Sequence, residues 1–220
     1  MLRSSVYYVQ LLCAHKITNE NNGKNTVRLI AIVGSVFISC VVLAGGTQAE
    51  DLAITGSDFN CMLDMQPVRG FYVDNLIEGK LQDTLTVARA EQGDYPPGSV
   101  VQLVPGEVMV KHPKGFSEAT KDWEFFELNV SSDGTQINKR GFVDVVNRFG
   151  GNCLGCHAKA RPEFDMICET GHGCDPIPLT AEMTALLQKT DARCGGRYTP
   201  TPEEIEVLKA LAAQMNAAQQ

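Results

Sequence analysis

The sequence has no excess of basic residues and a single long apolar run, and these two features exclude several classes of protein. Nineteen Lys and Arg residues stand against 26 Asp and Glu residues, which gives a net charge of −7 at pH 7. Nucleic-acid binding needs clustered positive charge to contact phosphates, so we expect no nucleic-acid partner. The composition is 44% hydrophobic and 20% charged, which is typical of a globular protein rather than a disordered or multi-span membrane chain.

The apolar run covers residues 29–45 and follows two basic residues, Lys24 and Arg28. Small residues stand at the positions that signal peptidase recognises before Ala49, so the pattern predicts a secretory signal cleaved after Ala49. An uncleaved N-terminal anchor is the alternative, and it would place the protein at a membrane. A lipoprotein site at Cys40 is disfavoured because the apolar run continues beyond it.

Removal of the predicted signal peptide and its N-terminal extension, residues 1–49, leaves a domain of residues 50–220. This part holds 15 basic and 25 acidic side chains, a net charge of −10. The acidic balance suits a periplasmic protein, including one that docks on a basic redox partner protein.

Six cysteines lie in the exported part: Cys61, Cys153, Cys156, Cys168, Cys174 and Cys194. Two belong to a motif described below, and the other four are an even number in an oxidising compartment. Four cysteines allow three pairings. We favour a short loop closed by Cys168 and Cys174 and a long-range link between Cys61 and Cys194, with free buried thiols as the alternative.

The periodicity of apolar residues predicts a helix, then antiparallel strands, then helices. Residues 50–70 give no regular pattern, and residues 73–88 carry apolar side chains every fourth position, which predicts an amphipathic helix weakened by Gly79. Alternating and β-branched segments predict strands at 100–104, 107–111 and 123–130 and in the region 137–146. Thr180 and Thr201 are predicted to cap two further helices. The fold class is therefore α+β, a single domain with a central antiparallel sheet.

Residues 153–157 have the sequence Cys-Leu-Gly-Cys-His. Two thiols three positions apart can add to the two vinyl groups of haem, and His157 can then supply the proximal iron ligand. A CxxC redox pair is one rival interpretation, but it would be expected near a βαβ pattern, which is absent. Half of a zinc site, completed by Cys168 with His172 or Cys174, is the other. With the export signal, the motif predicts one covalent haem c.

The order of features from residue 95 to residue 160 resembles the cytochrome P-460 and cytochrome c′-beta family. The resemblance rests on Pro96-Pro97-Gly98-Ser99-Val100, the strand at 108–111, Trp123-Glu124-Phe125-Phe126 and the segment 152–160. It implies a β-rich cytochrome with one c-type haem. The tail of residues 161–220, which is predicted to be helical and stapled by disulfides, lies outside the resemblance.

The resemblance implies two kinds of chemistry. In cytochrome P-460 a lysine is cross-linked to the haem, and the enzyme oxidises hydroxylamine or nitric oxide. The matching position here is Leu103, which argues against the cross-link, and Lys111 is the nearest basic strand residue. The c′-beta members imply five-coordinate, gas-binding iron in an apolar pocket, which Trp123, Phe125 and Phe126 would suit, with ordinary sheet core as the alternative for each.

The ligand at the sixth coordination position of the iron decides between two functions. An open position predicts binding of nitric oxide or oxidation of a nitrogen compound, with Lys111 and Arg148 as candidate catalytic residues. A filled position predicts a plain electron-transfer cytochrome. The candidate distal ligands are His112, His172, Met109 and Met183. If they do not bind iron, we expect the two histidines to lie in an exposed turn or loop and Met183 to pack in the core.

Overall fold

The protein is described from a computed structural model, in which residues 51–218 are placed. The predicted signal segment 1–49, including the cleavage position at Ala49 and Cys40, lies outside the described residues. Within the described part, no helix combines the length and the apolar character needed to cross a membrane.

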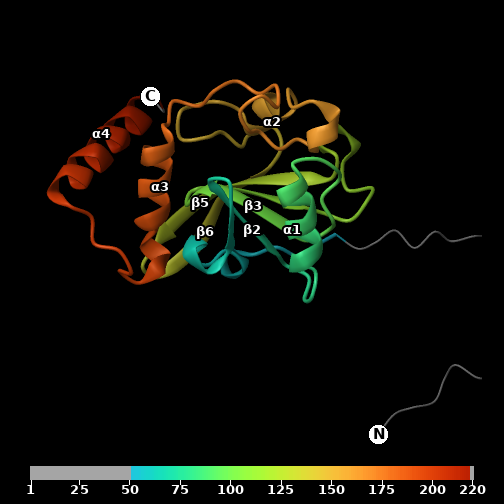
Figure 1. Ribbon diagram of the computed structural model, residues 1–220, viewed down its shortest axis with the longest axis horizontal. Helices are drawn as coiled ribbons and strands as arrows, with labels where there is room; N and C mark the ends of the chain where they lie inside the picture. The colour runs from blue at the N-terminus through green and yellow to red at the C-terminus, as the bar shows by residue number, and fades with distance from the viewer. Residues whose placement is uncertain (1–50, 219–220) are drawn as a thin grey trace, which may run out of the picture. The chain divides into compact units, whose positions relative to one another are not determined.

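A six-stranded antiparallel sheet forms the centre of the fold, and each strand pairs with the next along the chain (Figure 1). The strands are β1 Gln66–Val68, β2 Phe71–Asn75, β3 Ser99–Val104, β4 Glu107–Lys111, β5 Trp123–Ser131 and β6 Gly134–Gly141. The α-helices are α1 Leu81–Ala90, α2 Cys153–His157, α3 Ala181–Lys189 and α4 Pro202–Ala218. Short 3-10 turns occupy Gly56–Asp58, Met62–Asp64, Glu118–Thr120, Pro162–Phe164 and Ala192–Cys194. The predicted α+β class with a central antiparallel sheet is confirmed.

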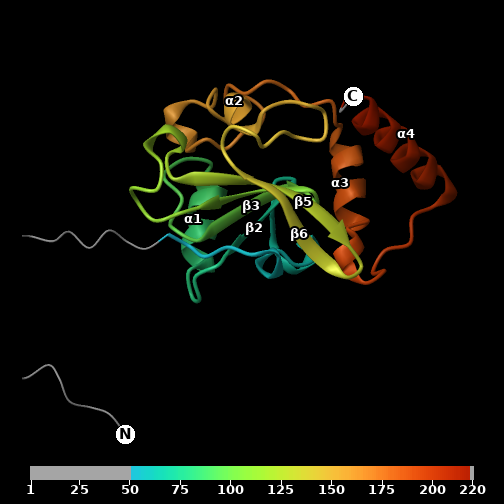
Figure 2. The ribbon, with the colours of Figure 1, turned by 180° about the vertical axis from the view of Figure 1, so that it is seen from behind.

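The two faces of the sheet bury separate apolar clusters because successive side chains of a strand point to opposite faces. One cluster contains Val101, Met109 and Phe125 together with Leu85 of α1. The other contains Val108 and residues from the neighbouring strands. Helix α2 lies against the first face, where its residues join the cluster (Figures 1 and 2).

The helix predicted over residues 73–88 is wrong in its first half. Residues 71–75 form strand β2, and the helix α1 starts only at Leu81. Phe71 and Val73 are buried while Tyr72 between them is only partly buried, so this segment follows the two-residue period of a strand. Gly79 has φ +77°, a left-handed conformation that separates the strand from the helix.

The strand predictions in the middle of the chain are confirmed to within one residue, but the flanks differ. Strand β1 lies in the stretch 50–70 that shows no pattern, because its three residues are too few to show a period. Strand β6 begins at Gly134 and ends at Gly141, so the strand predicted in the region 137–146 stops early.

Both favoured disulfides are confirmed, one joining Cys61 to Cys194 and the other joining Cys168 to Cys174. The predicted helix caps are also confirmed. The Thr180 hydroxyl accepts a hydrogen bond from the amide of Met183 at the start of α3. Helix α3 packs against β3, and α4 packs against α3 (Figure 1).

Candidate functional site

The motif of residues 153–157 forms the short helix α2, and Asn152 fixes its start. The Asn152 Oδ1 atom accepts a hydrogen bond of 2.7 Å from the amide of Gly155, and its Nδ2 atom donates to the carbonyl of Val143 at 2.8 Å. The amide of Cys153 donates to the carbonyl of Val145. These bonds hold both cysteines and the histidine on one and a half helical turns, at the edge of the first apolar cluster.

His157 is oriented by a backbone carbonyl from further along the chain. Its Nδ1 atom lies 2.7 Å from the carbonyl oxygen of Met166. A carbonyl can only accept, so Nδ1 carries the proton and Nε2 keeps its lone pair for a metal. Burial lowers the pKa of His157, which keeps the imidazole neutral. This is the state in which histidine ligates iron.

Within residues 51–218, Cys153 and Cys156 are the cysteines that form no disulfide. Burial, with the charge of Glu107 as the next cause, raises the pKa of the Cys153 thiol to about 12. Glu107 faces Glu127 on the neighbouring strand. One carboxylate oxygen of Glu127 is buried and has no hydrogen-bond partner in the described chain. Neither acid belongs to a sequence motif, because only the pairing of β4 with β5 places them together beside Cys153.

An apolar wall from the sheet faces the histidine. The ring centroid of Phe125 lies 5.2 Å from that of His157, and Met109 lies beside Phe125 on the neighbouring strand. Trp123 belongs to the same buried cluster. The prediction that Phe126 shares this pocket is wrong, since Phe126 faces the opposite side of the sheet in an edge-on contact with Phe59.

Lys111 lies under this wall in a buried ion pair. Its Nζ atom lies 2.8 and 2.9 Å from the two carboxylate oxygens of Asp165. Asp165 also accepts from the amide of Tyr95, and its carbonyl accepts from the indole of Trp123. Burial raises the pKa of Asp165, an effect that the hydrogen bond from Lys111 offsets in part. Lys111 therefore holds the residue next to Met166, whose carbonyl orients the histidine.

The two other histidines of the described chain differ in how their ring nitrogens are engaged: both nitrogens in His112, but only Nδ1 in His172. His112 is buried: its Nδ1 atom accepts from the amide of Leu52, so the proton lies on Nε2, 2.8 Å from the carboxylate of Glu124. His172 was expected to be exposed and is instead buried, stacked on Phe164, with Nδ1 at 2.8 Å from the carbonyl of Ile167. The geometry leaves His112 no free lone pair for a metal.

The zinc interpretation of the motif is not supported by the arrangement of sulfur. Cys168, which both versions of the zinc site require as a thiolate, is bonded to Cys174. A disulfide sulfur carries no thiolate charge to bind zinc.

A cavity of about 330 Å³ has Glu107, the acid near Cys153, in its wall. Its lining includes Glu107, Arg148, Phe149 and Met215 of α4. The side chain of Arg148 donates to the carbonyl of Leu128 at 2.9 Å, which holds the guanidinium at the cavity wall. Met183, on α3, is partly buried and is not among the lining residues.

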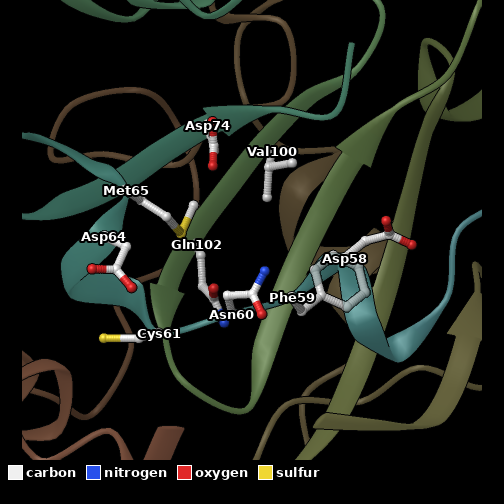
Figure 3. A pocket seen from close by; sticks show the side chains of 9 residues that line it. All are labelled: Asp58, Phe59, Asn60, Cys61, Asp64, Met65, Asp74, Val100 and Gln102. Atoms are coloured by element: carbon white, nitrogen blue, oxygen red, sulfur yellow. The ribbon is translucent and has the colours of Figure 1, made fainter. Parts of the chain in front are cut away.

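A second cavity, of about 220 Å³, lies on the opposite face of the sheet (Figure 3). Val100 and Gln102 of strand β3 line it, together with three acidic residues, Asp58, Asp64 and Asp74. It shares no residue with the motif. Two of its acids are already engaged, Asp58 by the backbone of residue 55 and Asp64 by residue 197.

Comparisons with protein-family models, with curated proteins and with solved structures give no match for this chain. The site must therefore be judged on its own chemistry. A covalent haem requires two free thiols three positions apart and a neutral imidazole with Nε2 free, and this site has both. It also has an apolar wall beside them. The residues present fit the group.

Proposed function

We propose that the protein is an exported monohaem c-type cytochrome in which Cys153 and Cys156 carry the haem and His157 is the proximal iron ligand. The observation that carries the proposal is the orientation of His157 by the Met166 carbonyl at 2.7 Å, directly after two free thiols. A hydrogen bond at the second ring nitrogen fixes the tautomer and the ring plane of a ligating histidine. Haem would supply reversible one-electron chemistry and a site for a diatomic ligand.

We further propose that the sixth position is open or weakly held, so that the haem binds a small nitrogen ligand such as nitric oxide. Two observations support this choice. His112 offers no lone pair to the iron, because both of its ring nitrogens are engaged within the fold. The wall formed by Trp123 and Phe125 is apolar, which excludes water from such a site. Oxidation of hydroxylamine or nitric oxide is the turnover that we would test.

Met109 favours the alternative of a plain electron-transfer cytochrome. Its side chain belongs to the buried cluster that includes Phe125, the ring next to His157. A thioether bound at the sixth position would close the coordination sphere and leave the iron to exchange electrons only.

Absorption spectra of the purified protein, ferric and reduced, with and without carbon monoxide and nitric oxide, test both proposals. A pyridine haemochrome on the same sample reports covalent attachment, which Cys153→Ser combined with Cys156→Ser should abolish. A high-spin reduced spectrum that shifts with carbon monoxide supports the open site. A low-spin spectrum indifferent to carbon monoxide, which becomes responsive in Met109→Leu, assigns Met109 as ligand and the electron-carrier function.

A further inference from the structure

A free thiol lies beside a disulfide at the end of helix α2. The Sγ atoms of Cys156, Cys168 and Cys174 all lie within 4.8 Å of one another. Cys168 and Cys174 are bonded, while Cys156 is free, and all three residues are partly exposed. The free sulfur therefore lies close to both bonded sulfurs.

The fold holds the disulfide loop, residues 168–174, against the chain that follows the motif. The amide of Arg161 donates to the carbonyl of His172 at 2.8 Å, and an ion pair joins Lys159 to Asp175. Gly173 permits the closest approach, because a Cβ atom added there would lie 2.6 Å from the carbonyl oxygen of Lys159. The proximity of the three sulfurs therefore follows from a docked backbone.

We propose that, before haem is attached, the Cys156 thiol exchanges with the Cys168–Cys174 disulfide. The thiolate of Cys156 attacks one of the two bonded sulfurs. A new S–S bond forms as the Cys168–Cys174 bond breaks, and the departing sulfur leaves as a thiolate that takes up the proton lost by Cys156. The number of disulfides is unchanged, so the step needs no oxidant or reductant.

The consequence rests on the proposed function, because Cys156 can form a thioether to haem only as a free thiol. In the exchanged form Cys156 is bonded to the loop, and haem cannot attach to it. The loop of the tail thus regulates when the motif is ready for haem. Attachment of haem then ends the exchange, since a thioether sulfur is no longer a nucleophilic thiol.

Disulfide mapping of the haem-free full chain tests the exchange. The variant Cys153→Ser removes the competing disulfide within the motif. After incubation at neutral pH without added thiol, the sample is acidified, alkylated and digested with trypsin. Cleavage at Lys159 separates Cys156 from the two loop cysteines. We expect a cross-linked pair of peptides at a yield independent of protein concentration. Among the cysteines of residues 51–218, alkylation confined to Cys156 at all times would overturn the proposal.

Two glycines of the loop provide a matched pair of variants. Gly173→Ala places a methyl group against the Lys159 carbonyl and should slow the exchange at least tenfold. Gly171→Ala also occupies a left-handed position, with φ +86°, but has open space around it, so its exchange rate should stay near that of the Cys153→Ser parent. Equal rates in the two variants would contradict the docking that the proposal requires. Circular dichroism checks that both variants fold.

The pyridine haemochrome separates this inference from the proposed function. A normal haemochrome in the unsubstituted chain, together with no cross-linked peptide, overturns the exchange alone. Cross-linked peptide without any haemochrome overturns the haem proposal, and with it the regulatory consequence, while the exchange itself stands.

Discussion

At the scale of the residue, the buried pair of Lys111 and Asp165 is the clearest case of a side chain whose role depends on its partner. Lys111 ends strand β4 with a charged side chain, yet it is 7% exposed and Asp165 is fully buried. Asp165 has φ +47°, so the loop that carries Met166 turns in a left-handed conformation. The ion pair stabilises that turn, which makes Lys111 a positioning residue for His157.

We predict that Lys111→Met lowers the free energy of unfolding by about 3–5 kcal/mol, because it leaves the Asp165 carboxylate buried and unpaired. The double variant Lys111→Met with Asp165→Asn should recover part of this loss, since both charges are then removed. Urea denaturation of the parent, the two single variants and the double variant measures the coupling.

The control for this cycle is Lys80→Met, which breaks an exposed ion pair with Asp83. That variant should lose at most about 1 kcal/mol. If Lys111→Met lowers the free energy of unfolding no more than the control does, the ion pair does not hold the loop in place. Lys111 would then be tested as a catalytic residue instead.

At the scale of the element, helix α4 begins with a reciprocal cap. The amide of Glu204 donates to the Thr201 hydroxyl at 3.2 Å, and the amide of Thr201 donates to the Glu204 carboxylate at 2.9 Å. Leu211 is the residue of α4 that is buried, so packing contributes little along most of the helix. The first turn of α4 therefore depends on its cap more strongly than the first turn of a buried helix does.

We predict that Thr201→Ala weakens the first turn of α4 by about 1 kcal/mol. Amide hydrogen exchange should then quicken roughly fivefold at Ile205, whose amide donates to the Thr201 carbonyl, because a smaller free energy separates the closed and open turn. Thr199→Ala, two residues before the cap, is the matched control and should leave the exchange rate unchanged. Equal rates in the two variants would mean that packing, and not the cap, holds this turn.

At the scale of the whole molecule, two disulfides of very different span constrain the chain. Cys61 and Cys194 are 133 residues apart, whereas Cys168 and Cys174 are six apart. The long link joins the segment before the sheet to the segment between α3 and α4. Beside it, Asp191 forms a buried ion pair with Arg193 and also accepts a hydrogen bond from the amide of Met62. The same junction is therefore held both by a covalent bond and by polar contacts.

We predict that replacing the long-range disulfide with Cys61→Ala and Cys194→Ala costs about 5 kcal/mol of stability, while Cys168→Ala with Cys174→Ala costs about 2 kcal/mol. The difference follows from the entropy of the unfolded chain, which a longer closed loop restricts more. Urea denaturation of the two paired variants measures it. A larger cost for the short loop would show that its docking on residues 159–161 contributes more than the loop closure.

Features that depend on short covalent spacing could be predicted from the amino-acid sequence alone. The motif of residues 153–157, the caps at Thr180 and Thr201 and the central strands each lie within one turn or one hairpin, so local pattern was enough. The favoured disulfide pairings were also right, since the short loop closes easily and leaves a single pairing for the other two cysteines.

Features that depend on partners far along the chain could not be predicted from the sequence, because they form only when distant segments pack together. Residues 71–75 are a strand because β1 and β3 pair with them on either side, although apolar spacing alone favoured a helix at 73–88. The carbonyl that orients His157, the acid that pairs with Lys111 and the disulfide beside Cys156 all come from residues 165–174. These contacts form when the loop folds back onto α2 and the sheet, and no local periodicity encodes that docking.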